Sequence, residues 1–266
     1  MLNSNHIKLI RSISKHFRNS SSISTVLGIE TSCDDTAVAI VNTEHTIRAE
    51  SKYNQWFVHK SLGKSKDKNE STSFTGGIIP NVARLLHNEN LIYAVSDCIK
   101  KIDNGWNDID AIALTVKPGL EPCLWEGIQF TKLLLKKYKL PFIPIHHMEA
   151  HALTPRLFNK NLKFPYLTLL ISGGHCIIAL VAKENEFYRY GESIDISPGN
   201  FIDKIARQLG LFQLNQEYSS GGALLELYAK NGDPDSFPRI IRSAVTYCKQ
   251  NKNCDVSFAG KLVKLL

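Results

Sequence analysis

Two apolar hairpins with small polar tips constrain the fold of this 266-residue chain more than any other feature. In the first, residues 26–41, two apolar runs flank the polar turn at 31–35. In the second, residues 167–181, two similar runs flank Ser172-Gly173-Gly174-His175. Short apolar runs on either side of a polar turn are typical of paired strands. Because the pattern recurs after about 140 residues, it predicts two related halves.

Strands and helices are expected to alternate between and after these hairpins. Apolar spacing predicts helices and strands in turn at 81–101, 111–116, 122–138 and 142–145. Two further helices are expected to begin at Pro198-Gly199 and at Gly221-Gly222. The stretch 60–73 is charged, Ser-rich and without periodicity, so we expect a surface loop there. This alternation predicts an α/β fold.

The first 29 residues are basic and contain no acidic side chain. Their cationic residues are Lys8, Arg11, Lys15 and Arg18. With the three serines at 20–22, this composition is typical of an organelle transit peptide, although a disordered basic tail has the same composition. We therefore expect a transit-like segment over residues 1–25. The rest of the formal charge of +7 is a mild basic bias that is compatible with nucleic acid.

Cysteine usage and hydropathy narrow the class of protein further. None of the six cysteines forms a Cys-x-x-Cys pair, which argues against a zinc ribbon or a disulfide framework. That usage suits a reducing compartment. No apolar run approaches the roughly 18 residues of a membrane-spanning helix, so we expect a soluble protein with no membrane partner.

His147 and His151 are spaced as i and i+4 at the predicted start of a helix. Such residues share a helix face, with Cβ atoms roughly 5–6 Å apart, so both imidazoles can reach one divalent metal ion. A zincin peptidase carries its catalytic Glu directly after the first His, where this chain has Met148. Glu149 lies about 200° around the helix from His147. The spacing thus excludes a zincin and leaves either another metal site or two incidental histidines.

The glycine-containing segments are candidate anion-binding positions. Ser172-Gly173-Gly174 follows a predicted strand, and glycine lets a ligand approach the backbone N–H groups closely. The N-termini of the helices at 198 and 221 also attract anionic groups. For the first segment taken alone, the pattern favours a plain hairpin turn over an anion-binding loop. Asp203, one turn into its helix, is either a ribose-binding carboxylate or an exposed charge.

Asp34 and Asp35 are the carboxylates of the first hairpin tip. There are two interpretations: they hold a metal ion or a water molecule near a phosphate, or they form the turn. Because the two residues are adjacent, the turn is favoured for at least one of them. The chain has no Ser-His-Asp arrangement by spacing, no Walker loop and no Gly-x-Gly-x-x-Gly motif. The chemistry-bearing set is therefore a metal-capable histidine pair together with glycine tips suited to a nucleotide.

Several motifs occur together in one order along the chain. They are Gly28-Ile29-Glu30-Thr31-Ser32-Cys33-Asp34-Asp35-Thr36, Gly76-Gly77-Ile78-Ile79-Pro80, the strings 146–151 and 170–175, Gly191-Glu192-Ser193-Ile194-Asp195, and Asp203-Lys204. Over residues 26–260 this set resembles the tRNA threonylcarbamoyladenosine synthase family, the TsaD family once called O-sialoglycoprotein endopeptidase-like. The strings 145–153 and 194–203 look most like its mitochondrial branch.

The resemblance implies a fold and a division of the chain. The expected fold is α/β, actin-like or sugar-kinase-like (ribonuclease H-like), with two duplicated halves. The halves would be residues 26–145 and 146–266, with the second half incomplete. Chains of this family continue well past Leu266 and carry there an Asn for the nucleotide and an Asp that completes the metal site.

The resemblance also implies a reaction and its site residues. A threonylcarbamoyl group would pass from L-threonylcarbamoyladenylate, made by a separate synthase, to the exocyclic amine of the adenine beside the anticodon of mitochondrial tRNAs. His147 and His151 would bind one divalent metal ion, with Zn or Fe as candidates. No residue is expected to act as a nucleophile, and members in mitochondria tend to be homodimers. The residues implied to hold the adenylate are Leu170, Ile171, Ser172, Gly173, Gly174, Asp203 and Gly222.

Some positions depart from the family pattern. Lys117 occupies the position of the first glycine in the family's usual Gly-Pro-Gly-Leu motif. Asn200 stands where the motif leading to Asp203 usually has an acidic residue. Glu121-Pro122 and Trp125-Glu126 lie where small and aliphatic residues are usual, so local packing is expected to differ. These departures, and the absent Asn and Asp, leave open a non-catalytic paralogue that binds adenylate, tRNA or an active partner. A metallopeptidase is the least favoured alternative because Glu149 is displaced.

Overall fold

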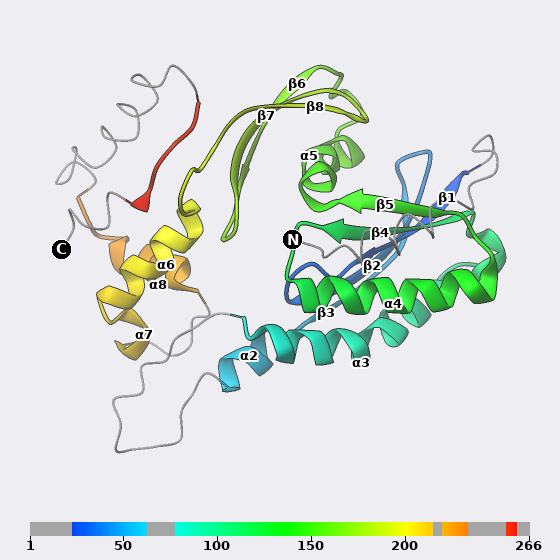
Figure 1. The fold of residues 1–266 in the computed structure, drawn as a ribbon, viewed down its shortest axis with the longest axis horizontal. Helices are drawn as coiled ribbons and strands as arrows, with labels where there is room; N and C mark the ends of the chain where they lie inside the picture. The colour runs from blue at the N-terminus through cyan, green and yellow to red at the C-terminus, as the bar shows by residue number, and fades with distance from the viewer. Residues whose placement is uncertain (1–22, 63–77, 215–219, 234–253, 260–266) are drawn as a thin grey trace. The chain divides into compact units, whose positions relative to one another are not determined.

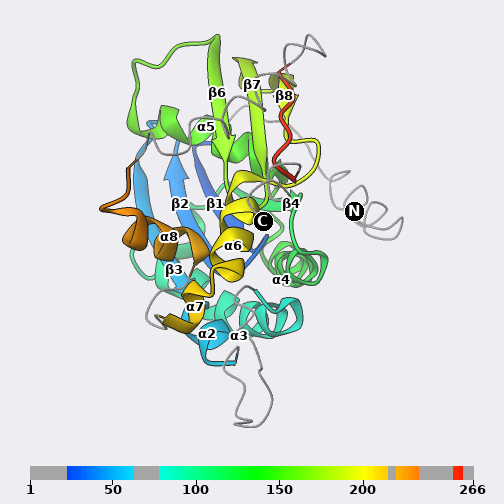
Figure 2. The ribbon, with the colours of Figure 1, turned by 90° about the vertical axis from the view of Figure 1, so that its left-hand side faces the viewer.

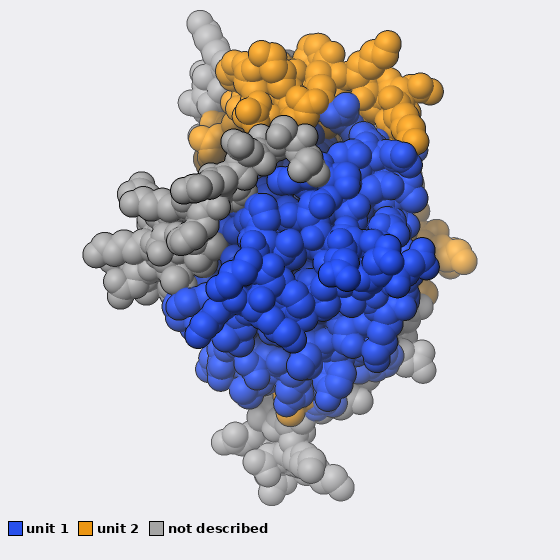
Figure 3. Space-filling view, turned by 90° about the vertical axis from the view of Figure 1, so that its right-hand side faces the viewer, with its two compact units in different colours: residues 1–61, 78–158 blue, residues 62–77, 159–266 orange. Residues whose placement is uncertain are grey.

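The structure, a computed structural model, describes residues 23–62, 78–214, 220–233 and 254–259. These residues form two compact units (Figure 3). Unit 1 contains residues 23–61 and 78–158 of the described chain, and unit 2 contains Leu62 and the described residues after Phe158. Compactness thus groups residues 146–158 with the first unit, whereas the predicted halves rest on the repeated hairpin and stay a prediction. Most of the transit-like segment and of the expected loop at 60–73 lies outside the described residues.

Unit 1 is built on a five-stranded sheet of order β3-β2-β1-β4-β5 (Figure 1). Its strands are β1 (Thr25–Glu30), β2 (Asp35–Asn42), β3 (Ile47–Asn54), β4 (Ala111–Lys117) and β5 (Phe142–His146). β1 pairs antiparallel with β2 and parallel with β4, which is itself parallel to β5. The carboxyl ends of β1, β4 and β5 therefore lie at one edge of the sheet, where α/β proteins usually place their ligands.

The helices of unit 1 cover this sheet. They are α2 (Trp56–Leu62), α3 (Pro80–Ile99), α4 (Glu121–Tyr138) and α5 (His147–Phe158). α3 and α4 lie side by side, α3 against β2 and β3 and α4 against β4, while α5 packs on β4 and β5 (Figure 1). A proline in the first turn of α3 and of α4 favours the start of each helix there. The core between sheet and helices includes Leu27, Leu91 and Ile112, all fully buried.

Glu126 shows how α4 accommodates a charge where the resemblance led us to expect a small or aliphatic residue. Its side chain is only 10% exposed and accepts a hydrogen bond from Arg84 Nη1 of α3 at 2.7 Å. Asn88 Nδ2, also on α3, donates to the other carboxylate oxygen at 2.9 Å. A buried carboxylate requires such partners, so the departure at Glu126 is compensated by polar residues on the neighbouring helix.

Unit 2 contains a three-stranded antiparallel sheet of β6 (Tyr166–Ile171), β7 (Cys176–Lys183) and β8 (Glu186–Glu192). A group of three helices follows, namely α6 (Pro198–Gln208), α7 (Leu211–Leu214) and α8 (Gly221–Ala229) (Figure 2). Ala206, Leu211, Phe212 and Leu224 form the small core of this helical group. Ser197 and Ser220 cap α6 and α8 by accepting backbone N–H bonds within the first turn.

The α/β prediction is confirmed, and both predicted hairpins are present as β1-β2 and β6-β7. The predicted helices at 81–101 and 122–138, and those opened at 198 and 221, correspond to α3, α4, α6 and α8. β3 and β8 were not predicted because their sequences carry too many polar residues for an apolar run, and pairing with β2 and β7 forms them. Among the described residues no helix combines the length and the hydrophobicity needed to cross a bilayer.

Candidate functional site

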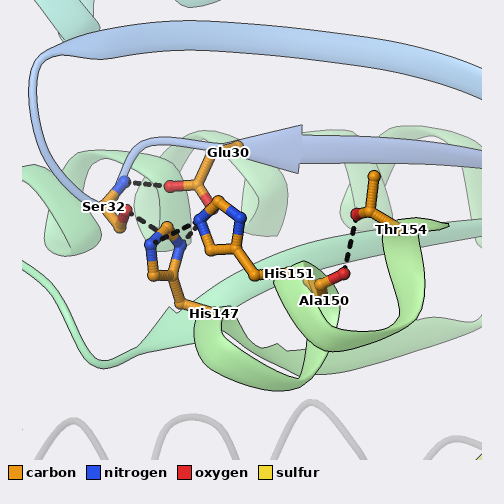
Figure 4. A network of polar contacts seen from close by, with 6 residues as sticks. All are labelled: Glu30, Ser32, His147, Ala150, His151 and Thr154. Carbon is orange, nitrogen blue, oxygen red and sulfur yellow. Dashed lines mark hydrogen bonds and ion pairs between the residues drawn. The ribbon is translucent and has the colours of Figure 1, made fainter. Parts of the chain in front are cut away.

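β5 delivers the histidine pair to the carboxyl edge of the unit 1 sheet. The strand ends at His146 and α5 begins at His147, so His147 and His151 lie one turn apart on the same helix face (Figure 4). Their Nε2 atoms are 3.1 Å apart, and the two rings are perpendicular. Met148 is buried and Glu149 is exposed, so Glu149 cannot take the place of a zincin carboxylate. The predicted i,i+4 geometry of the pair is present.

Two residues that sequence reasoning did not assign hold the other side of His147. Glu30 Oε2 lies 3.1 Å from His147 Nδ1, and Ser32 Oγ lies 3.2 Å from the same nitrogen (Figure 4). The backbone N–H of Ser32 donates to the second oxygen of Glu30. The available signal in the sequence was a carboxylate that closes an otherwise apolar strand at the edge where ligands bind.

The surroundings of Glu30 keep it ionised. Burial raises the pKa of its carboxyl, but hydrogen bonds with His147, Ser32 and Thr115 outweigh burial and bring the pKa down to about 2. A carboxylate at Nδ1 favours the tautomer that carries its proton there, which directs the Nε2 lone pair toward His151. Burial and the neighbouring His147 both lower the pKa of His151, which favours its neutral form. Neutral imidazoles are the form that ligates metals.

This arrangement fits the donor set of a metal ion. Imidazole–metal bonds of about 2.0–2.1 Å place two ligand nitrogens roughly 3–3.5 Å apart, and the Nε2 atoms of His147 and His151 meet that requirement. A carboxylate bound to the far nitrogen of a ligating histidine is a common outer partner. Within the described ranges, no group of three or more His, Cys, Asp or Glu residues is arranged for a metal ion.

The carboxylates of the first hairpin tip differ in their partners. Asp35 Oδ2 forms an ion pair with Lys52 Nζ at 2.6 Å, and Asp35 Oδ1 accepts a hydrogen bond from Asn54 at 2.9 Å. Both partners are on β3, so Asp35 belongs to the turn and its strand pairing. Of the two alternatives left by the sequence, Asp35 thus takes the structural one.

The predicted glycine turn of unit 2 packs on the start of α6. Gly199 N–H donates to Ser172 C=O, and a Cβ at Gly199 would lie 2.7 Å from Gly173 Cα, so only glycine fits there. Ser172 Oγ accepts from the N–H groups of Gly174 and His175, at 3.2 and 3.0 Å. These two donors are therefore already satisfied within the turn. A Cβ added to Gly173 or Gly174 would meet no atom within 4 Å, which leaves the backbone open to a ligand.

Asp203 and the start of α8 lie together. A Cβ at Gly221 would be 2.7 Å from both Cα and Oδ1 of Asp203, so glycine permits this approach. Asp203 is half-buried, not fully exposed, and Gly222 is the next residue of α8. Leu170 and Ile171 form the end of β6 that leads into the glycine turn. Asp203 and Gly222 therefore lie on neighbouring helices, as a shared nucleotide site would need.

Asp195 binds residues 257–259, a contact that the sequence did not predict. Its carboxylate accepts the hydroxyl of Ser257 and the backbone N–H groups of Ile196, Phe258 and Ala259. Burial raises the pKa of Asp195, but these bonds prevail and lower it. Asp195 thus ties residues 257–259 to the loop before α6.

A family model described as tRNA N6-adenosine threonylcarbamoyltransferase (TsaD) matches residues 62–266. The chain belongs to this family. It is 44% identical over 254 residues to the mitochondrial enzyme of that name from Mus musculus, covering 94% of this chain and 56% of the relative. The corresponding protein of Homo sapiens is 45% identical over 237 residues, covering 88% and 52%. The chain thus spans about half the length of these curated relatives.

Solved structures give weaker similarities. YeaZ from Pseudomonas aeruginosa has a TM-score of 0.38 at 15% identity, over 66% of this chain and 68% of that chain. A ROK family glucokinase from Streptomyces griseus, solved with glucose and AMPPNP, has a TM-score of 0.41 at 12% identity, over 80% and 72%.

Proposed function

We propose that the protein is a tRNA threonylcarbamoyladenosine synthase of mitochondria. It transfers the threonylcarbamoyl group of L-threonylcarbamoyladenylate to the exocyclic amine of the adenine adjacent to the tRNA anticodon. The amine nitrogen forms a bond to the carbamoyl carbon, the bond from that carbon to the phosphate oxygen breaks, and AMP leaves as the amine loses a proton. The observation that carries the proposal is 44% identity to a mitochondrial transferase over 94% of this chain. It favours catalysis over a non-catalytic paralogue.

In this proposal His147 and His151 hold one divalent metal ion, with Zn or Fe as candidates. When bound, the ion supplies a Lewis acid for the phosphate–carbamoyl anhydride. Glu30 and Ser32 fix the ring of His147 from the opposite side. Two observations support this proposal. The Nε2 atoms of His147 and His151 lie 3.1 Å apart, and the carboxylate of Glu30 contacts Nδ1 of His147.

The adenylate is proposed to bind unit 2. Residues 170–174 present a backbone with open space above the two glycines. Asp203, on α6 beside the start of α8, is proposed to bind the ribose, and Gly222 to let the nucleoside approach. Helix N-termini stabilise negative charge on the departing phosphate.

The proposed macromolecular partners are tRNA and a second copy of the chain. Lys132, Lys136 and Lys137 are exposed on α4 and offer charge for tRNA phosphates. Leu85, Ile92 and Tyr93 are exposed apolar residues of α3. We propose them as part of a homodimer interface. Light scattering tests it, because Ile92→Glu should give a monomer if the wild type is a dimer.

The test of the transfer reaction combines purified protein, mitochondrial tRNA transcript, a divalent metal and L-threonylcarbamoyladenylate. Mass spectrometry of digested nucleosides should detect threonylcarbamoyladenosine with the wild type and lose it with His151→Ala. In cells, disruption of the gene should remove the modification from mitochondrial tRNAs. Unchanged modification after disruption would reject the proposed function.

A further inference from the structure

His87 of α3 is fully buried, and both of its ring nitrogens contact the turn between β1 and β2. Nδ1 lies 2.7 Å from Thr36 Oγ1, and Nε2 lies 3.0 Å from the carbonyl oxygen of Cys33. The two contacts are on opposite sides of the turn's aspartates. One ring therefore fixes both ends of residues 33–36.

The partners define the tautomer of His87. A carbonyl oxygen only accepts, so Nε2 carries the proton and donates to Cys33. Nδ1 then accepts the hydroxyl proton of Thr36. Burial lowers the pKa of His87, which keeps the ring neutral in this arrangement. With both nitrogens used, His87 has no donor or acceptor left for a metal ion or substrate, and any role it has in the reaction must act through the turn.

The turn is also the support of His147. Ser32, next to Cys33, places Oγ 3.2 Å from His147 Nδ1, and its N–H bonds the carboxylate of Glu30. Leu120 N–H also donates to Ser32 C=O at 2.7 Å. Gly119 packs so closely that a Cβ there would lie 2.6 Å from that carbonyl oxygen. His87 and the loop at 119–120 thus clamp the segment that orients His147.

We propose that His87 is a positioning residue that sets the tautomer and orientation of His147 through the Cys33–Thr36 turn. The importance of this for transfer rests on the proposed function, whereas the effect on His147 does not. Loss of either contact of His87 should let the turn shift. Glu30 and Ser32 would then hold His147 less strictly, and Nε2 would point less often toward His151.

The test uses Thr36→Val, which removes the hydroxyl partner while conserving side-chain volume. Thr36→Ser restores a hydroxyl, and His59→Gln is a control for altering a buried histidine whose hydrogen bonds go to Gln55 and Ile79 and not to this turn. In protein labelled with ¹⁵N-histidine, long-range proton–nitrogen spectra report the tautomer of each neutral ring. Wild type, Thr36→Ser and His59→Gln should keep His147 protonated at Nδ1, and Thr36→Val and His87→Gln should give a mixture of tautomers. An unchanged His147 spectrum in Thr36→Val would overturn the proposal.

Titration with Co²⁺ alone, followed by its visible absorption, separates this inference from the proposed metal site. Outer partners of a ligand typically change metal affinity by about 10–100-fold, so Thr36→Val should weaken Co²⁺ binding about tenfold and Thr36→Ser should restore it. If the wild type and His151→Ala bind Co²⁺ equally, the proposed metal site is wrong, and the tautomer spectra still decide the role of His87. If Co²⁺ binds at the pair and Thr36→Val matches the wild type, the positioning role is rejected.

Discussion

β1 and β6 begin the two similar hairpins, but their surroundings differ. β1 has a strand on each side, and its alternating side chains Leu27 and Ile29 are buried. β6 pairs only with β7 among the described residues, and Leu169 on it is 58% exposed. The same apolar alternation thus gives a core in one unit and an exposed face in the other. A hairpin pattern thus determines strand pairing, whereas neighbouring elements determine how much each strand stabilises the fold.

Truncation of one leucine on each strand should give the largest contrast. Leu27→Ala removes a fully buried side chain, and we expect a loss of about 3 kcal/mol in the free energy of unfolding. Leu169→Ala should change it by less than about 0.5 kcal/mol, because solvent already reaches the side chain. Urea denaturation measures both. Equal losses would mean that Leu169 on β6 is as buried as Leu27 on β1, which would contradict the difference between the two hairpins.

Glu30 and Asp195 are the carboxylates that organise the segments near each hairpin. The pKa of Glu30 lies at about 2 against an ordinary 4.5, so its stabilisation is complete above pH 4.5 and is lost as pH falls through 2. The shift corresponds to at most about 3 kcal/mol, reduced because solvent reaches part of the side chain. Glu30→Gln should flatten the loss of stability between pH 4.5 and 2.

Asp195→Asn is the matched variant for that measurement. The pKa of Asp195 is lowered from an ordinary 3.8, so its contribution is lost only as pH falls below that value. Asp195→Asn should therefore leave the profile above pH 4 nearly parallel to that of the wild type. A Glu30→Gln profile parallel to the wild type at every pH would show that Glu30 is not held ionised by its neighbours.

Two glycines at the candidate sites should respond differently to an added methyl group. In Gly119→Ala the new Cβ would lie 2.6 Å from the backbone oxygen of Ser32, and we expect a loss of about 2 kcal/mol. In Gly174→Ala nothing lies within 4 Å, so stability should change little. If the turn at 172–174 holds the adenylate, Gly174→Ala should weaken binding of AMP, measured by calorimetry. Normal stability of Gly119→Ala would contradict the close packing of the two loops.

Surface ion pairs should show the smallest difference between the units. Lys52–Asp35 in unit 1 and Arg189–Glu192 in unit 2 are both well exposed on the cationic side. Exposed pairs contribute up to about 1 kcal/mol, and we expect Lys52→Ala and Arg189→Ala each to cost less than about 0.5 kcal/mol. Similar small losses in both variants would indicate that the two units differ in stability because of burial and not because of charge pairing. A loss near 2 kcal/mol for either variant would reject that view.

Local sequence determined the elements whose formation depends on their own residues. The period of apolar side chains located α3 and α4, and prolines and glycines located the starts of α6 and α8. The i,i+4 spacing of His147 and His151 was sufficient to place both imidazoles together, because helix geometry is fixed. The motifs together indicated the family before any geometry was known.

The surroundings of those elements depend on contacts between segments that are distant in sequence. Glu30 and His147 are 117 residues apart in sequence, and their contact exists because parallel pairing of β1, β4 and β5 aligns the carboxyl ends of the strands. His87 likewise contacts Cys33 and Thr36 from a helix that is distant in sequence. Asp35 is held in the turn by partners on β3. Spacing along a chain determines only local geometry, whereas contacts across a sheet depend on pairing and packing that no single segment encodes.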